Sequence, residues 1–231
     1  MIAKFRGTLI SIALILCVII AVSSGVMAEE IVEFEDPALE QAVREEIGEH
    51  NDDLYAGDVR NIDELIANDS EIDSLEGIQH LENIESLHFK DNRVEDISPV
   101  AELNMLEWLS FDGNRVEDIS PLTELDNLVW LFFTDNRVDD ITPLAEIPSL
   151  EYLDFSRNEV SDLSPLSELA NLERLIFSDN EVGDLGPLVE NEHMGAGLKI
   201  DIHDNELDPI RSSVDLMDIT QLESRGVEIN Y

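Results

Sequence analysis

The sequence is poor in cysteine and in positive charge. Its 231 residues include one cysteine, Cys17, and carry 13 lysine and arginine residues against 53 aspartate and glutamate residues, for a formal net charge of -40. Because Cys17 lies in the first 28 residues, the rest of the chain can form no disulfide, thiolate metal site or cysteine nucleophile. An acidic surface also excludes nucleic acid as a partner, since phosphate binding requires the opposite charge.

The first 28 residues have the layout of a secretory signal peptide. Lys4 and Arg6 precede an apolar run from Leu9 to Val22, and Val26-Met27-Ala28 supplies a small-residue cleavage pattern. An uncleaved membrane anchor is the alternative, because the apolar run is nearly long enough to span a bilayer. Ser23-Ser24-Gly25 breaks the helix before the cleavage pattern and favours cleavage. Without a retained anchor no membrane span is expected, and the chain is expected to be secreted, or extracellular and retained at the cell surface.

A repeat of 22 residues dominates the remaining sequence. The segment 109–130 (LSFDGNRVEDISPLTELDNLVW) contains the whole pattern, and neighbouring segments differ from it by small changes. One such unit cannot bury its own apolar face, so the repeat predicts a solenoid in which stacked units share a continuous core. The leucines that mark the 22-residue spacing are Leu65, Leu87, Leu109, Leu131, Leu153 and Leu175.

Each position of the repeat has a physical explanation. Leu109 and Phe111 alternate with polar residues, which predicts a short strand with one buried face in a parallel sheet. Asn114 and its counterparts follow the strands, where a buried amide can satisfy the backbone groups of a turn. Pro121 fits the turn into a return segment, and the leucines that follow it at three-residue spacing predict a 3₁₀-like or short helical return.

The two ends of the stack are predicted to be capped. At the start, Asp36 and Pro37 mark the beginning of a helix that Gly48 ends. Near the end, the asparagine spacing changes from 22 to 25 residues between Asn180 and Asn205, and a helix-like run before Gly226 precedes a last strand. The predicted domains are a signal peptide (1–28), a helical N-terminal cap (29–64), about six leucine-rich repeats with an irregular last one (65–197), and a final repeat strand with an α/β C-terminal cap (198–231).

The repeat with its asparagine and its Asp-Ile-Ser-Pro-Leu motif resembles the leucine-rich repeats of internalins and related secreted bacterial proteins. The start FEDPALEQAVREEIG and the closing stretch LESRGVEINY resemble the segments that precede and end those repeats, so the resemblance covers residues 32–231. It implies a right-handed superhelical α/β solenoid that binds proteins or envelope components through a concave parallel sheet. The sequence lacks the Leu-Pro-x-Thr-Gly-type sorting signal, C-terminal membrane segment and immunoglobulin-like domain of larger members, so the resemblance does not support covalent wall attachment.

Strand positions between the core residues are predicted to face the concave side, where they form columns across the repeats. One column runs Ser86, Trp108, Trp130, Tyr152, Arg174, and the next runs His88, Ser110, Phe132, Asp154, Ile176. The aromatic residues of these columns can stack on each other merely to cover the sheet, or they can form a contact surface for a partner. We favour the contact surface, because a cluster of exposed aromatics on an acidic protein does not serve solubility.

Arginine placement adds a second hypothesis. Arg157 and Arg174 fall on the strand side near Tyr152 and Asp154, where they can pair within the patch or recognise an acidic or carboxylate ligand; both interpretations stay open. In contrast, Arg93, Arg115 and Arg137 are expected to pair with neighbouring acids. The candidate ligand-binding residues are Trp108, Trp130, Phe132, Tyr152, Arg174, Arg157 and His88.

The sequence gives little support to catalysis, and no cofactor is expected. His88, Ser110 and Asp112 fall close together on the predicted sheet face, but an open sheet offers no deep pocket or oxyanion hole. An aspartate column, Asp96 with its counterparts at 118, 140, 162 and 184, is expected to cap turns; calcium binding is the alternative. We therefore predict a binding module for a protein, with a carbohydrate or envelope polymer, or a structural spacer without ligand, as alternatives.

Overall fold

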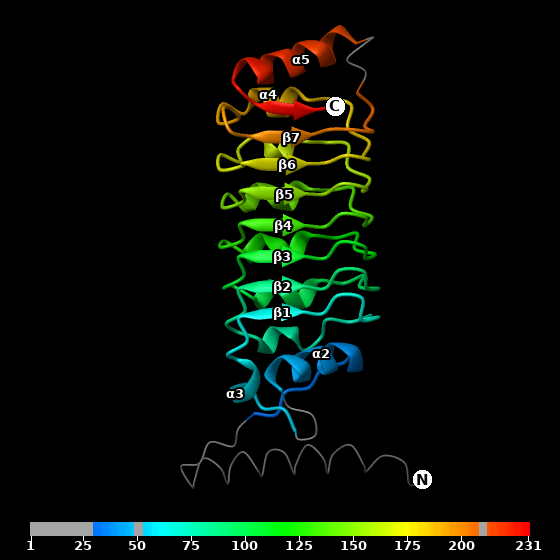
Figure 1. The fold of residues 1–231 in the computed structure, drawn as a ribbon, viewed down its shortest axis with the longest axis vertical. Coiled ribbons are helices and arrows are strands. Elements are labelled where there is room, and N and C mark those ends of the chain that lie inside the picture. The colour runs from blue at the N-terminus through cyan, green and yellow to red at the C-terminus, as the bar shows by residue number, and fades with distance from the viewer. Residues whose placement is uncertain (1–29, 49–52, 208–211) are drawn as a thin grey trace, which may run out of the picture.

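The structure is a stack of eight short parallel strands whose order in the sheet follows their order in the sequence. It is a computed structural model that describes residues 30–48, 53–207 and 212–231, so the predicted signal peptide lies outside the described residues. Figure 1 shows β1 to β7 one above another, with α2 below the first strand and α5 above the last. The strands are β1 (Glu64–Ile66), β2 (Ser86–His88), β3 (Trp108–Ser110), β4 (Trp130–Phe132), β5 (Tyr152–Asp154), β6 (Arg174–Ile176), β7 (Lys199–Asp201) and β8 (Glu228–Asn230).

The strands pair in the register that the repeat predicts. Trp108 lies opposite Trp130 and Leu109 opposite Leu131 in the parallel pair β3–β4, and the 22-residue offset holds from β1 through β6. Arg174 lies opposite Lys199, so the last repeat is longer by three residues. The prediction of a leucine-rich-repeat solenoid with a parallel, unclosed sheet is confirmed.

Short helical segments return the chain from one strand to the next. Pro121 stands in the first turn of η3 (Ser120–Glu124), where its fixed φ suits the tight helix, and Leu122, Leu125 and Leu128 are buried beneath it. This confirms the predicted 3₁₀ return, although the last return is an α-helix, α4 (Gly186–Glu190). The other 3₁₀ segments are η1 (Ile78–His80), η2 (Ser98–Glu102), η4 (Thr142–Glu146) and η5 (Ser164–Leu166).

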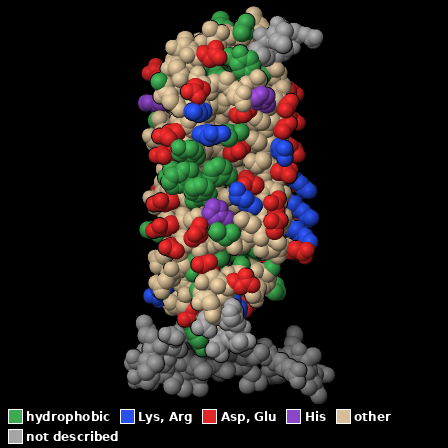
Figure 2. Space-filling view, in the orientation of Figure 1, with side chains coloured by type: hydrophobic (Ala, Val, Ile, Leu, Met, Phe, Trp, Pro, Cys, Tyr) green, Lys and Arg blue, Asp and Glu red, His purple; other side chains and the backbone are tan. Residues whose placement is uncertain are grey.

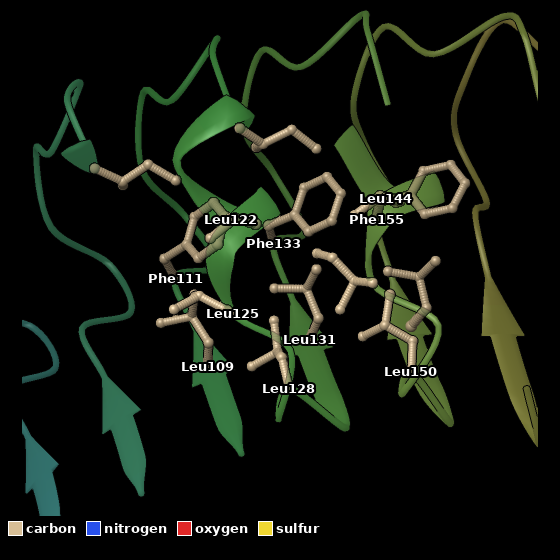
Figure 3. Close-up of a cluster of buried hydrophobic side chains, with 14 of the residues drawn as sticks. Leu109, Phe111, Leu122, Leu125, Leu128, Leu131, Phe133, Leu144, Leu150 and Phe155 are labelled. Atoms are coloured by element: carbon tan, nitrogen blue, oxygen red, sulfur yellow. The ribbon is translucent and has the colours of Figure 1, made fainter. Parts of the chain in front are cut away.

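The core lies between the sheet and these returns and continues through every repeat. Figure 3 shows the leucines of the strands and returns with the phenylalanines that follow each strand, all directed into one cluster. Phe111 and Phe133 are fully buried, and their ring centroids stack 5.5 Å apart. The stack of five rings gives neighbouring repeats a shared apolar contact, which no single repeat could form; its members are Phe89, Phe111, Phe133, Phe155 and Phe177.

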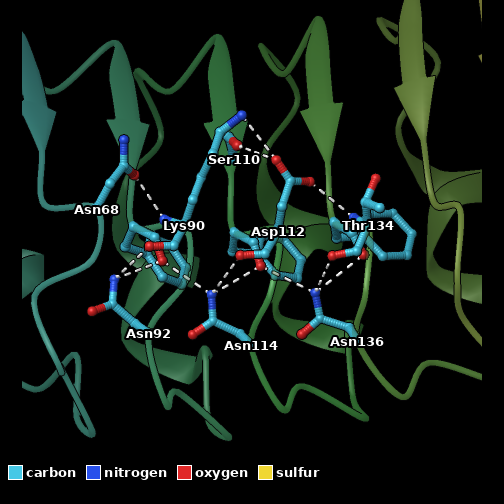
Figure 4. Close-up of polar contacts among 11 residues, drawn as sticks. Asn68, Lys90, Asn92, Ser110, Asp112, Asn114, Thr134 and Asn136 are labelled. Atoms are coloured by element: carbon cyan, nitrogen blue, oxygen red, sulfur yellow. Dashed lines mark hydrogen bonds and ion pairs between the residues drawn. The ribbon is translucent and has the colours of Figure 1, made fainter.

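Buried asparagines link each repeat to the preceding one. The side-chain amide of Asn114 donates to the carbonyls of Phe89 (3.0 Å) and Phe111 (2.9 Å), and its Oδ1 accepts from the backbone N–H of Val94 (3.0 Å). Figure 4 shows the bonds that the amides of Asn92, Asn114 and Asn136 donate to backbone carbonyls, and Oδ1 of Asn92 and of Asn136 likewise accepts from a backbone N–H. We call this series, from Asn92 through Asn205, the asparagine ladder; it confirms the predicted role of the buried amides.

The predicted helices at the two ends are present. Asp36 caps α2 (Pro37–Ile47) by accepting from the N–H of Ala38 at 2.7 Å, and Gly48 ends it with a φ of 71°. A short helix, α3 (Ala56–Val59), follows before β1. At the other end, α5 (Ser213–Ser224) covers the last strands with Ile219 and Leu222.

The apolar residues of α5 are only partly buried. Val214 is 56% exposed and Leu216 50% exposed. The reason is that α5 is the last layer of the stack and packs on the chain through one face only.

No helix in the described part of the chain is both long and apolar enough to cross a membrane.

Candidate binding surface

Four aromatic side chains gather on the exposed face of strands β3–β5. We call this group, Trp108, Trp130, Phe132 and Tyr152, the aromatic patch. The indoles of Trp108 and Trp130 stack with centroids 5.3 Å apart, because the two residues are register partners of a parallel pair. Phe132 packs beside Trp108 at 5.5 Å and Tyr152 beside Trp130 at 6.2 Å. Figure 2 shows the resulting hydrophobic area at mid-height of the molecule, surrounded by charged side chains.

The rings of the patch lie on the sheet and shield it. All four residues are half-buried, and Nζ of Lys90 lies 5.9 Å from the centroid of the Phe132 ring. The Nε1 atom of Trp108 is buried and is the one buried side-chain polar atom of the described residues without a hydrogen-bond partner. A buried donor without an acceptor costs about 1–3 kcal/mol. The ring contacts of the patch therefore stabilise the sheet, whereas the buried N–H of Trp108 lowers its stability.

His88 borders the patch. Its ring lies 5.7 Å from that of Trp108, and its Nε2 is 2.9 Å from the Ser86 hydroxyl. Burial is the main cause that lowers the pKa of His88, although Glu64 and Asp112 oppose it. The imidazole is consequently neutral at pH 7 and adds a polar, uncharged edge to the patch.

The structure separates the two candidate arginines. Arg174 follows Tyr152 in the strand register and lies on the exposed face beside the patch. Arg157 lies in the turn after β5 with a φ of 56°, in a backbone position that aspartate or glycine occupies in the neighbouring repeats. Its guanidinium is 3.6 Å from a carboxylate oxygen of Asp179. The structure thus brings Arg174 to the patch and gives Arg157 an ion pair of its own.

Tyr152 extends the patch toward its acidic rim. Its hydroxyl donates to Glu173 at 3.0 Å, and this hydrogen bond is the main cause that raises the pKa of Tyr152. The phenol therefore presents an apolar ring over the sheet and a satisfied polar end toward solvent, as rings at binding surfaces commonly do.

The side chains of His88, Ser110 and Asp112 do not form a catalytic relay. The hydrogen bond of His88 is to Ser86, whereas the Ser110 hydroxyl donates to Asp112 at 3.2 Å. Asp112 in turn pairs with Lys90 at 2.9 Å, as Figure 4 shows. With no bond between the imidazole and the Ser110 hydroxyl, the three side chains do not have the hydrogen-bond order of a Ser-His-Asp triad.

The aspartate column caps the turns. Oδ1 of Asp118 accepts from the backbone N–H of Ser120 at 2.8 Å, and the same bond forms at every counterpart: Asp96, Asp140, Asp162 and Asp184. Within residues 30–48, 53–207 and 212–231, no group of three or more His, Cys, Asp or Glu side chains is placed to hold a metal ion. The expected pairing of the other arginine column is also found, since Arg115 lies 3.6 Å from Glu95 and Arg137 lies 3.6 Å from Glu117.

One feature of this face was missed in the sequence. A hollow of about 280 Å³ lies over β6–β8 and is lined by Arg174, Ile176, Lys199, Asp201, Glu228 and Asn230 among others. The 22-residue columns end at Arg174, whereas the hollow depends on Lys199, which lies 25 residues further along. Extending the column by the 25-residue spacing of the last asparagines would have found it.

Comparisons with known proteins agree with this architecture. Residues 148–190 match the family of Leucine Rich repeats (2 copies), and no curated protein sequence matches the chain significantly. The structure of internalin inlF from Listeria monocytogenes is 26% identical with a TM-score of 0.73, over 85% of this chain and 55% of that one. Internalin C2 from the same organism is 28% identical with a TM-score of 0.64, over 88% of this chain and 99% of that one.

A third structure shares the fold alone. The functional domain of InlJ from Listeria monocytogenes is 17% identical with a TM-score of 0.60, over 84% of this chain and 52% of that one. That domain is described as including a cysteine ladder, whereas this chain has asparagines linking its repeats and its one cysteine at position 17. The chain spans about half the length of the inlF and InlJ structures. Repeat pattern, sheet register and these likenesses together identify the chain as an internalin-like leucine-rich-repeat protein.

Proposed function

We propose that this chain is a secreted or surface-exposed binding module that recognises a protein partner through the aromatic patch. The observation that carries the proposal is the placement of both tryptophans of the chain on adjacent rungs of the exposed sheet face. Tryptophan, tyrosine and arginine are the residue types that dominate binding energy at protein interfaces. Arg174 and His88 complete the proposed contact surface at its two ends.

The composition of the same strands supports this interpretation. Inward positions repeat leucine or isoleucine at every rung, as packing requires, whereas the outward positions of one column change from Ser86 through the aromatics to Arg174. A face that served only to stay soluble in this acidic chain would carry charged residues there. The signal-peptide pattern of residues 1–28 supports export of the module.

Ring geometry favours a protein over a carbohydrate. A sugar ring binds to the open face of an aromatic side chain, but the planes of Trp108 and Trp130 are inclined by only 27° and stack on each other. Phe132 packs against Trp108 as well, so the patch offers ring edges and partly covered faces. Such a surface suits the apolar side chains of a protein.

The double variant Trp108→Ala/Trp130→Ala tests the proposal. Its matched control is Ile66→Ala/Met105→Ala, which removes apolar side chains that are 59% and 48% exposed outside the patch. Cross-strand aromatic pairs stabilise a sheet by about 0.2–1 kcal/mol each, so both variants are expected to fold. We expect wild type and control to capture the same protein from envelope extracts and the tryptophan variant to lose it.

Treating the envelope extract with protease or with glycan-degrading enzymes distinguishes a protein partner from a carbohydrate. Capture that survives protease but is lost after glycan-degrading enzymes would assign the patch to a carbohydrate. Equal capture by the folded tryptophan variant would remove the patch from the binding surface.

A further inference from the structure

Among the described residues of this strongly acidic protein, Arg174 has no ion-pair partner. Its side chain is exposed on the sheet face at β6, next to Tyr152. Within the described residues, no carboxylate lies within ion-pairing distance of its guanidinium, although Lys90, Lys199 and most other arginines there have such a partner. Arginine offers five N–H donors in a planar fork that matches a carboxylate. A guanidinium without a carboxylate partner therefore requires an explanation in a chain with so many acidic residues.

Asp154, on the neighbouring strand β5, and Glu173, which precedes Arg174 in the sequence, both accept hydrogen bonds from neutral donors. Asp154 accepts from the N–H and the hydroxyl of Ser156 at 3.0 and 2.7 Å. Glu173 accepts from the hydroxyl of Tyr152. Both acids thus have hydrogen-bond donors of their own, and neither forms an ion pair with Arg174 among the described residues.

Asp201, on the next strand, is engaged by two neutral donors and by His203, whose pKa is raised mainly by this hydrogen bond. It accepts from Ser178 at 2.7 Å, His203 at 2.7 Å and Asn230 at 2.8 Å. Burial raises its pKa, but these hydrogen bonds outweigh burial and hold the pKa at about 2. Asp201 thus lines the hollow with its carboxylate bound to these three donors, and among the described residues it forms no ion pair with Arg174.

Lys199 provides a second cation on the adjacent rung. It is the register partner of Arg174, and its Nζ lies 3.3 Å from Glu228, with both side chains at least 60% exposed. An exposed pair of this kind contributes little and is readily exchanged. Figure 2 shows Lys or Arg side chains directly above the hydrophobic area on this face.

We propose that Arg174, with Lys199, binds a carboxylate side chain of the protein partner in the hollow over β6–β8. The inference rests on the proposed function, because it assigns the chemistry of one end of the same contact surface. Two strand spacings separate Trp130 from Arg174, or about 10 Å, which an extended peptide crosses with about three residues. The partner segment accordingly carries an aspartate or glutamate about three residues from the apolar residue that contacts the patch.

Selection from a display library of random linear peptides on the immobilised chain tests the inference. We expect wild-type binders to combine an apolar or aromatic residue with an acidic residue at this spacing, against the repulsion of a protein with a net charge of -40. On Arg174→Gln/Lys199→Gln the acidic preference should disappear while the apolar preference remains. A wild-type binder should lose about tenfold in affinity for this variant.

Arg137→Gln is the matched control, because it removes an exposed arginine that pairs with Glu117 away from the sheet face. It should leave both preferences intact. Wild-type binders without acidic enrichment, or acidic enrichment that persists on Arg174→Gln/Lys199→Gln, would overturn the carboxylate assignment and leave the proposed function standing. If no selected peptide lost its binding on Trp108→Ala/Trp130→Ala, both the carboxylate assignment and the proposed function would be overturned.

Discussion

Phe132, the last residue of β4, and Phe133, which follows it, are neighbours in the sequence but lie on opposite sides of the sheet. Phe133 is fully buried and stacks between Phe111 and Phe155 at 5.5 and 5.9 Å. Phe132 is half-buried on the exposed face, where Trp108 and Lys90 are its partners. The first position is filled by phenylalanine from Phe89 through Phe177, whereas the second changes at every strand. The inward face thus fixes the fold, whereas core packing does not dictate which residue stands on the outward face.

The largest expected effect separates the two phenylalanines. Phe133→Ala should lower the free energy of unfolding by about 3–5 kcal/mol, because it leaves a cavity in a continuous ring stack. Phe132→Ala should cost about 1 kcal/mol or less, since it removes one partly covered surface contact. Urea denaturation followed by circular dichroism measures both. Equal losses would mean that the outward face also determines the fold.

The second largest expected loss of stability comes from removing one amide of the asparagine ladder. Asn136→Ala removes the acceptor of the Val116 N–H and the donor to the carbonyls of Phe111 and Phe133. Unsatisfied buried groups of this kind cost about 1–3 kcal/mol each, so we expect a loss of at least about 2 kcal/mol. The control is Asn127→Ala, whose exposed amide donates to the carbonyl of Asn104, and it should cost less than about 1 kcal/mol. Amide hydrogen exchange should also accelerate at Val116 in Asn136→Ala only.

The strand register and the core follow from the sequence because each repeat copies its neighbour. The 22-residue spacing alone aligns Leu109 with Leu131 and brings both tryptophans together. The sequence does not predict that Trp108 Nε1 lies without a partner, because side-chain rotation rather than spacing decides that contact. It also leaves open whether Arg157 pairs with Asp179 or with the patch, and which apolar residues of α5 stay exposed, since each depends on what the last layers of the stack leave uncovered.

Lowering the pH should reduce the contribution of the Asp201 carboxylate, on the outward face, to the free energy of unfolding. The pKa of Asp201 in the folded protein is about 2, below the value of about 3.9 for an aspartate in an unfolded chain. Its stabilising contribution is therefore complete above the unfolded-chain pKa and is lost as pH falls through the folded-state pKa. Asp201→Asn should therefore cost on the order of 1–2 kcal/mol at pH 5, after allowance for solvent screening, and much less at pH 2. The difference between the two unfolding free energies at each pH is the measurement; a constant difference would contradict the pKa.

The smallest effect concerns the unsatisfied indole. Trp108→Phe keeps an aromatic ring and removes the buried N–H, so we expect the free energy of unfolding to change by less than about 1 kcal/mol. Thermal unfolding followed by near-ultraviolet circular dichroism measures it. A loss of more than about 2 kcal/mol would show that Trp108 is as important to the fold as a core residue.

The asparagine ladder also determines where this chain can tolerate insertions during evolution. In the irregular last repeat, Asn205 still bonds to the carbonyl of Phe177 and to the N–H of Val182. The interval from the strand core residue to its asparagine is unchanged, since Ile200–Asn205 is as long as Leu175–Asn180. The three additional residues were accommodated on the return side of the coil. Duplication of a whole repeat, or lengthening of a return, consequently leaves the spacing between the outward-facing strand residues intact, so the stack can gain repeats without a change in its exposed sheet face.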